Sequence, residues 1–105
     1  MQGRDNAGVA RLSDDEIRSG LRGLPGWERR DDEIEKVYEL PSFADAIAFV
    51  TRVGFLAEKA NHHPDLDVRW RKVRTVLSTH DEGGITEKDL ALAGEIESAA
   101  AGSAA

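Results

Sequence analysis

The three histidines of this 105-residue chain are grouped around one short segment and one later position. His62 and His63 stand directly before Pro64 and shortly after Glu58, and His80 follows downstream. Histidine has an unperturbed pKa of about 6.5, so near neutral pH it can both donate and accept a proton. Because the chain contains no cysteine and one tyrosine, it has few other side chains for such chemistry. If the protein is an enzyme, its catalytic site is therefore expected at these histidines.

Two kinds of site are compatible with these residues. Glu58 and His62 have the spacing at which two helical side chains can reach one metal ion, and His80 is a possible third ligand. The adjacent side chains of His62 and His63 diverge on most backbones, which argues against a shared metal ion. The alternative is general acid–base catalysis, in which a carboxylate orients a histidine. We favour acid–base catalysis and expect no metal ion.

Other residues near the histidines have structural explanations beside functional ones. Thr86 and Asp89 have the spacing of a capping box, so Asp89 is first a carboxylate at a helix start, close in sequence to His80. Trp70 is typical of a core or cross-strand residue, although an aromatic ring beside a site can stack on a flat heterocycle. Gly83 and Gly84 are most simply a turn.

Caps and hydrophobic periodicity indicate the elements that would position these residues. Ser13 begins a short helix, and Ser42 begins a long one that must end near Asn61, because the residue before a proline avoids helical geometry. Thr86 begins a last helix. Strands are expected at residues 27–30, 34–40, 68–74 and 75–80. This order, α-β-β-α-β-β-α, favours an antiparallel sheet with helices packed on one face.

Length and composition indicate one domain. Residues 1–11 are expected to be a flexible leader and residues 99–105 a flexible tail, which leaves residues 12–98 as the domain. The net charge of −6 argues against a nucleic-acid-binding surface, and the basic segment 69–74 is expected to be a charged edge strand. No apolar run is long enough to span a bilayer. We therefore expect a cytoplasmic protein without nucleic-acid or membrane partners.

The spacing of these residues resembles that of the pterin-4a-carbinolamine dehydratase family. The resemblance runs from about Leu12 to Ile96 and implies an α+β domain in which a four-stranded antiparallel sheet carries three helices on one face. It also implies a homodimer or homotetramer. The residues that carry it are Glu58, His62, His63, Pro64, Trp70, His80 and Asp89, with similar surroundings at Trp27, Phe43, Phe49, Asn61, Val73, Thr79, Asp81, Gly83, Gly84 and Thr86.

The reaction that the resemblance implies is the dehydration of 4a-hydroxytetrahydropterin to quinonoid dihydropterin, with no metal and no bound cofactor. His62 and His80 would be the acid–base pair, and Glu58 would orient or charge-balance His62. His63 would hold the pterin in a cleft between the corner at residues 62–64 and the strand end at residues 79–80. The other residues expected around the substrate are Pro64, Trp70, Thr79 and Asp89. The competing class is a binding, dimerisation or assembly module of the same fold without catalysis.

Overall fold

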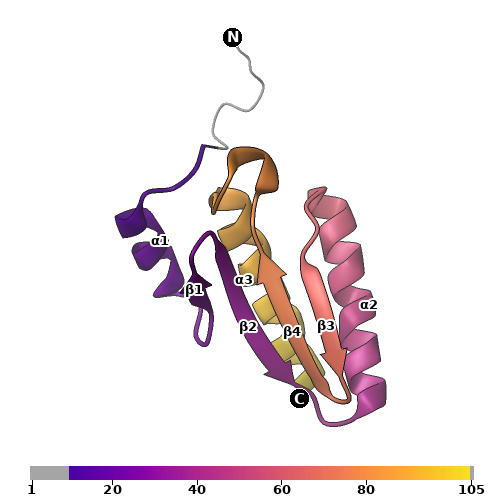
Figure 1. Cartoon of the computed structure of the whole chain (residues 1–105). Coiled ribbons are helices and arrows are strands. Elements are labelled where there is room, and N and C mark those ends of the chain that lie inside the picture. The colour runs from indigo at the N-terminus through magenta and orange to yellow at the C-terminus, as the bar shows by residue number, and fades with distance from the viewer. Residues whose placement is uncertain (1–9, 105) are drawn as a thin grey trace.

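A four-stranded antiparallel sheet lies at the centre of the structure, with strand order β1-β2-β4-β3 (Figure 1). The structure is a computed structural model that describes residues 10–104. The predicted α+β class and the order α-β-β-α-β-β-α are confirmed. The elements are α1 (Asp14–Leu21), β1 (Glu28–Arg30), β2 (Glu33–Glu39), α2 (Phe43–Ala60), β3 (Asp65–Arg69), β4 (Lys72–Leu77), the 3-10 helix η1 (His80–Glu82) and α3 (Glu87–Ala104).

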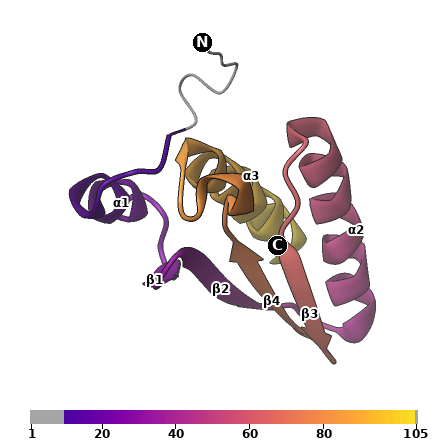
Figure 2. The ribbon, with the colours of Figure 1, turned by 45° about the horizontal axis from the view of Figure 1, so that its top comes forward.

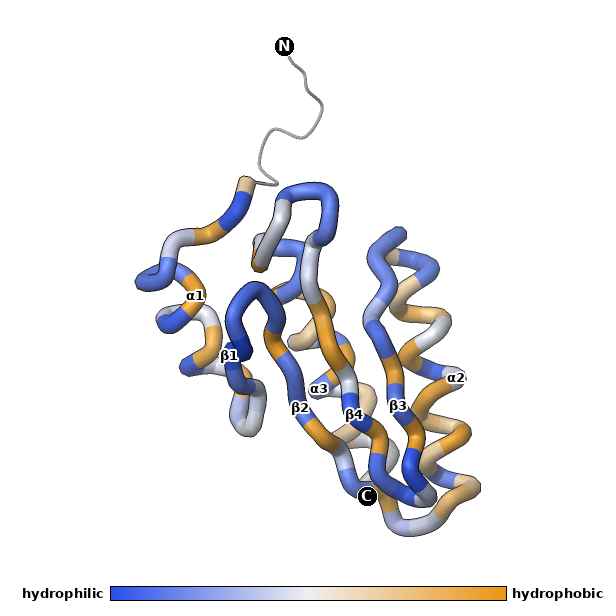
Figure 3. The backbone as a smooth tube through the Cα atoms, in the orientation of Figure 1, coloured by the Kyte–Doolittle hydropathy of each residue, from blue (hydrophilic) through white to orange (hydrophobic). Residues whose placement is uncertain are grey.

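The helices enclose the hydrophobic core against one face of the sheet. The long helices α2 and α3 lie side by side behind the strands, and α1 lies near β1 (Figures 1 and 2). Apolar and polar residues alternate along the strands (Figure 3), as expected when one face is buried. Leu90 of α3 packs over Gly20 of α1, where a β-carbon would clash. Fully buried residues of the core include Ile34, Phe49, Val53, Val73, Leu77, Leu92 and Ile96.

The predicted caps form where the sequence places them. Ser13 accepts a hydrogen bond from the Glu16 amide, and Ser42 accepts one from the Asp45 amide. Asn61 closes α2 in the left-handed conformation, with φ of 52°, which asparagine adopts more readily than most residues. Because α2 and α3 run in opposite directions, the end of α2 lies beside the start of α3 (Figure 1).

The predicted boundary between the last two strands is wrong. We expected strands at residues 68–74 and 75–80, but the chain turns at Trp70 and Arg71, between β3 and β4. Trp70 has φ of 58°, a left-handed geometry that is uncommon for tryptophan, so the residue type does not indicate a turn here. The pairing of Val68 with Val73 keeps the apolar side chains of both strands on one face. As a consequence β4 ends at Leu77, and His80 lies in η1 rather than at a strand end.

The last helix extends further than expected. The helix continues through residues 99–104, where we expected a tail, and Ala100 is buried. Alanine is the residue with the highest helix propensity, so an alanine-rich tail can lengthen a helix that packing has already formed. Of the predicted leader, only residues 10 and 11 lie within the described part of the chain, where they precede α1. None of the helices described is long and apolar enough to cross a membrane.

Candidate active site

The three histidines line one cavity of about 310 Å³, at the end of the sheet where α2 stops and α3 begins. This volume is at the lower end of the range of small-molecule sites. Three segments of the chain meet there: the corner after α2, the loop after β4 and the first turn of α3. The lining residues are Asn61, His62, His63, Ser78, Thr79, His80, Asp81 and Lys88.

His62 is held by a buried carboxylate on the neighbouring helix. Its Nε2 atom lies 2.6 Å from Oδ1 of Asp89, and Asp89 is fully buried. The other carboxylate oxygen, Oδ2, accepts hydrogen bonds from the hydroxyl of Thr79 and from the backbone amide of Thr86, both at 2.9 Å. Asp89 therefore serves the predicted helix start, and it contacts a histidine of the cavity at the same time.

The loop that carries His80 is fixed at its base. The backbones of Thr79 and Gly84 exchange two hydrogen bonds, of 2.9 and 3.3 Å. The buried Thr79 hydroxyl also lies 2.7 Å from the hydroxyl of Thr86. Gly83 closes η1 with φ of 73°, in the left-handed region that favours glycine. These contacts hold the backbone on both sides of His80 in place.

Glu58 contacts a different histidine from the one expected. Its Oε2 atom lies 2.7 Å from Nε2 of His63, whereas His62 turns toward α3. The helix has ended at the left-handed residue Asn61, and the backbone amide of His62 donates to the carbonyl of Ala57, so the helical spacing of Glu58 and His62 does not bring their side chains together. Glu58 and His63 are both largely exposed.

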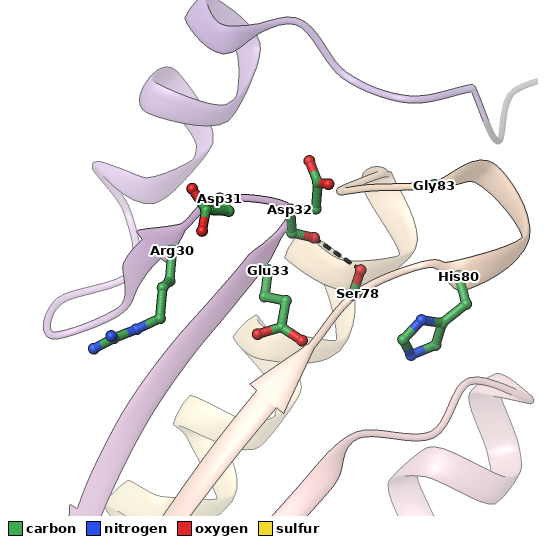
Figure 4. A pocket seen from close by; sticks show the side chains of 7 residues that line it. All are labelled: Arg30, Asp31, Asp32, Glu33, Ser78, His80 and Gly83. Atoms are coloured by element: carbon green, nitrogen blue, oxygen red, sulfur yellow. Dashed lines mark hydrogen bonds between the residues drawn. The ribbon is translucent and has the colours of Figure 1, made fainter.

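His80 lies between two cavities. Its side chain is exposed and has no hydrogen-bond partner among residues 10–104. With Ser78 and Gly83 it also lines a neighbouring cavity of about 380 Å³, in which the Ser78 hydroxyl donates to the carbonyl of Asp32 (Figure 4). The other residues of that cavity are Arg30, Asp31, Asp32 and Glu33. The His80 ring is therefore free to meet a ligand from the histidine cavity.

Of the predicted substrate contacts, Asp89 is fully buried and does not line this cavity, and two others lie elsewhere in the chain. Trp70 is at the turn between β3 and β4, at the opposite end of the sheet (Figure 1), and it is 71% exposed, with Arg71 stacked on its ring. Pro64 lines an apolar cavity of about 410 Å³ between α2 and β3, which shares His63 with the histidine cavity. Neither residue lines the cavity that holds all three histidines.

Several residues of the cavity were not predicted as site residues. Asn61, Ser78 and Asp81 directly adjoin predicted residues in the sequence, so their proximity was the available signal. Lys88, in the first turn of α3, adjoins the predicted residue Asp89 in the same way, and the packing of α3 beside the end of α2 brings it to the cavity. Within the described part of the chain, no group of three or more histidine, aspartate or glutamate side chains is arranged to hold a metal ion.

Comparison with known sequences identifies the family. The family described as pterin 4 alpha carbinolamine dehydratase matches residues 10–99. A protein of Roseiflexus sp. (strain RS-1), provisionally named pterin-4-alpha-carbinolamine dehydratase, is 59% identical over 89 residues, which cover 85% of this chain and 96% of that protein. A protein of Mycobacteroides abscessus with the same provisional name is 52% identical over 89 residues, covering 85% and 95%. The chain therefore belongs to the pterin-4a-carbinolamine dehydratase family, as the spacing of its residues predicted.

Solved structures show the same fold. A crystal structure from Brucella melitensis, described as a transcriptional coactivator/pterin dehydratase, superposes with a TM-score of 0.83 at 33% identity, covering 86% of this chain and 98% of that one. A pterin dehydratase-like protein identified as a RuBisCO assembly factor in the α-carboxysome has a TM-score of 0.59 at 21% identity, covering 70% and 86%. The second likeness concerns the fold alone.

Proposed function

We propose that this protein dehydrates 4a-hydroxytetrahydropterin to quinonoid dihydropterin. The observation that carries the proposal is the placement of His62, His63 and His80 in a single cavity. The cavity has the size of a small-molecule site, and its polar lining suits a flat heterocycle whose edge carries hydrogen-bond donors and acceptors. The family to which the chain belongs supports the same reaction.

The elimination needs two proton transfers and no change of oxidation state. The bond between C4a and the hydroxyl oxygen breaks, and a proton on that oxygen lets it leave as water. N5 loses its hydrogen, and its electron pair forms the double bond to C4a. A histidinium suits the first transfer and a neutral histidine suits the second. His62 and His80 are the proposed acid–base pair, because they reach the cavity from two different segments, the corner after α2 and the loop after β4.

His63 is proposed to bind the pterin rather than to carry out a proton transfer. Its Nε2 atom is paired with Glu58, which orients the ring where it lines the cavity. Asn61 and Asp81 supply further polar groups along the lining. The reaction as proposed requires no metal ion and no organic cofactor, and we place the protein in the cytoplasm.

A second candidate function is that of a binding or assembly module without catalysis. The observation that favours it is the set of large apolar side chains exposed on α2: Phe43 is 51% exposed, Ile47 44% and Phe55 73%. We propose that these side chains pack in a homodimer or homotetramer, which is compatible with either function. The two functions differ in one respect, because a binding module would not accelerate the dehydration.

Single substitutions of the two proposed acid–base residues test the assignment. His62→Ala and His80→Ala should each lower turnover about 10-fold or more, since one placed acid or base contributes about 10²–10⁴-fold, and the double variant should be slower than either. Circular dichroism should show an unchanged fold, and Glu95→Gln, on the exposed side of α3, is the matched control. Wild-type rates in both single variants would show that these residues do not carry the reaction, and loss of activity on chelation would favour a metal site.

A further inference from the structure

Asp89 is a buried carboxylate with three hydrogen-bond partners and no access to the cavity. It is 0% exposed, and it is absent from the cavity lining although it adjoins Lys88. A carboxylate removed from water is costly unless its oxygens are hydrogen-bonded. Here Oδ2 accepts from Thr79 and Thr86, and Oδ1 faces Nε2 of His62 at 2.6 Å. Asp89 can therefore act on a substrate only through a partner that lines the cavity, and of its partners His62 is the one that can exchange a proton near neutral pH.

The directions of these hydrogen bonds follow from the number of hydrogens available. An ionised carboxylate only accepts, so the Thr79 hydroxyl must donate its single hydrogen to Oδ2. The contact of 2.7 Å between the two threonine hydroxyls then requires Thr86 to donate to Thr79. The Thr86 oxygen in turn accepts from the backbone amide of Lys88 at 3.2 Å. Every hydroxyl hydrogen of the network is thus used, and Oδ1 is left to accept from His62.

The positions of the two helices favour the same direction of this hydrogen bond. His62 follows the carboxyl end of α2, where the helix dipole favours the positive end of an N–H group. Asp89 lies in the first turn of α3, where a negative charge is stabilised. The side chain of His62 is 10% exposed, so its ring is confined between the two helix ends. A hydrogen on Nε2 directed at Asp89 is the arrangement that satisfies all of these groups.

We propose that Asp89 is a positioning residue that holds neutral His62 as the Nε2–H tautomer and leaves Nδ1 as the atom that exchanges a proton with the substrate. No hydrogen bond to Nδ1 of His62 is formed within residues 10–104. The general principle is that the tautomer of a histidine is set by the hydrogen bond of its other nitrogen. The catalytic part of this inference rests on the proposed function, whereas the tautomer does not.

A helix cap alone would not require this arrangement. Asp45 of α2 occupies the equivalent place after Ser42, accepts from the Ser42 hydroxyl at 2.8 Å, and contacts no histidine of the described chain. Asp89→Asn is nearly isosteric and can keep one oxygen for Thr79 and Thr86. Its amide group would then face His62 and donate to Nε2, which favours the Nδ1–H tautomer. The substitution should therefore reverse the tautomer while the helix start is retained.

The test is nitrogen-15 NMR of the histidine rings in the full-length protein, at a pH where His62 is neutral, with signals assigned through His62→Gln. The wild-type chain should show His62 as Nε2–H, and Asp89→Asn should show Nδ1–H. The variant should also lower kcat about 100-fold, within the range for one acid or base, with a smaller change in KM. The matched control Asp45→Asn should change neither the tautomer nor kcat.

Two results would overturn the proposal. One is wild-type His62 as the Nδ1–H tautomer or as the mixture found in free histidine. The other is an Asp89→Asn variant with an unchanged tautomer and unchanged kcat. If this variant does not fold, the tautomer of His62 in the wild-type spectrum is sufficient to support or overturn the proposal. If the wild-type chain has no dehydratase activity, the proposed function fails, and the spectrum still decides whether Asp89 orients His62.

Discussion

Glu58 is paired with His63 across the last turn of α2, with 2.7 Å between Oε2 and Nε2. Their side chains are 76% and 60% exposed, so the pair contributes at most about 1 kcal/mol to stability, as is usual for exposed ion pairs. We therefore propose that the pair serves to orient the His63 ring, which lines the cavity. His62, the adjacent residue, makes its contact on α3 instead.

Glu58→Gln should accordingly change substrate binding more than chemistry. We expect the free energy of unfolding to fall by less than about 1 kcal/mol and KM to rise by less than about 10-fold, with kcat nearly unchanged. His63→Ala removes the ring itself and should raise KM further. Steady-state kinetics with 4a-hydroxytetrahydropterin separate the two constants. If Glu58→Gln instead lowered kcat about 100-fold at constant KM, Glu58 would belong to the chemical step.

Glu97 should make the stability of the fold depend on pH. Burial alone would raise the pKa of Glu97, but hydrogen bonds from Tyr38 at 2.6 Å and Lys36 at 2.9 Å, with the charge of Lys36, hold the pKa below its usual value. A carboxyl whose pKa is lowered in the folded state stabilises it above the unfolded pKa of about 4.5. That stabilisation is lost as the pH falls through the folded pKa.

Urea unfolding of Glu97→Gln at several pH values measures this contribution. At pH 7 the variant should be less stable by about 1–3 kcal/mol, the range for hydrogen bonds to a charged group. The difference from the wild type should shrink as the pH is lowered toward 3. Glu95→Gln, an exposed position on the same helix, is the control and should show no such trend. A difference that stays constant from pH 7 to pH 3 would contradict the account of Glu97.

The exposed apolar residues of α2 predict self-association. Light scattering at micromolar concentration should give at least twice the chain mass of 11.5 kDa. Phe55→Glu should shift the protein toward the monomer, because it introduces a charge where an apolar side chain is 73% exposed. Ala91→Glu, at an exposed position of α3, tests whether any added charge has this effect. A wild-type protein that is monomeric and fully active would contradict the predicted self-association.

The sequence was sufficient to place the histidines at element ends, because local signals determine where the flanking helices begin and end. Ser42 and Asn61 set the two ends of α2, and Pro64 fixes where the helix must stop. Thr86 and Asp89 mark the start of α3 in the same way. These are interactions between residues close in the chain, which is why composition and spacing reveal them.

The contacts of the site could not be predicted, because they depend on packing between elements. The pairing of His62 with Asp89 requires the end of α2 to lie beside the start of α3, and no local pattern reports that. Glu58 contacts His63 beyond the left-handed residue Asn61, where helical spacing no longer predicts which side chains meet. The turn at Trp70 lacks the glycine or asparagine that usually signals a left-handed residue, so the strand boundary was misplaced.

The most direct test of the central claim is the first-order rate constant for the disappearance of 4a-hydroxytetrahydropterin, measured by absorbance as the protein concentration is increased. We expect the rate constant to rise in proportion to the concentration of wild-type protein. The His62→Ala, His80→Ala double variant should bring it back close to the rate without protein. A rate constant that does not change with wild-type protein, at concentrations up to that of the substrate, would contradict the proposed dehydratase and favour the binding module.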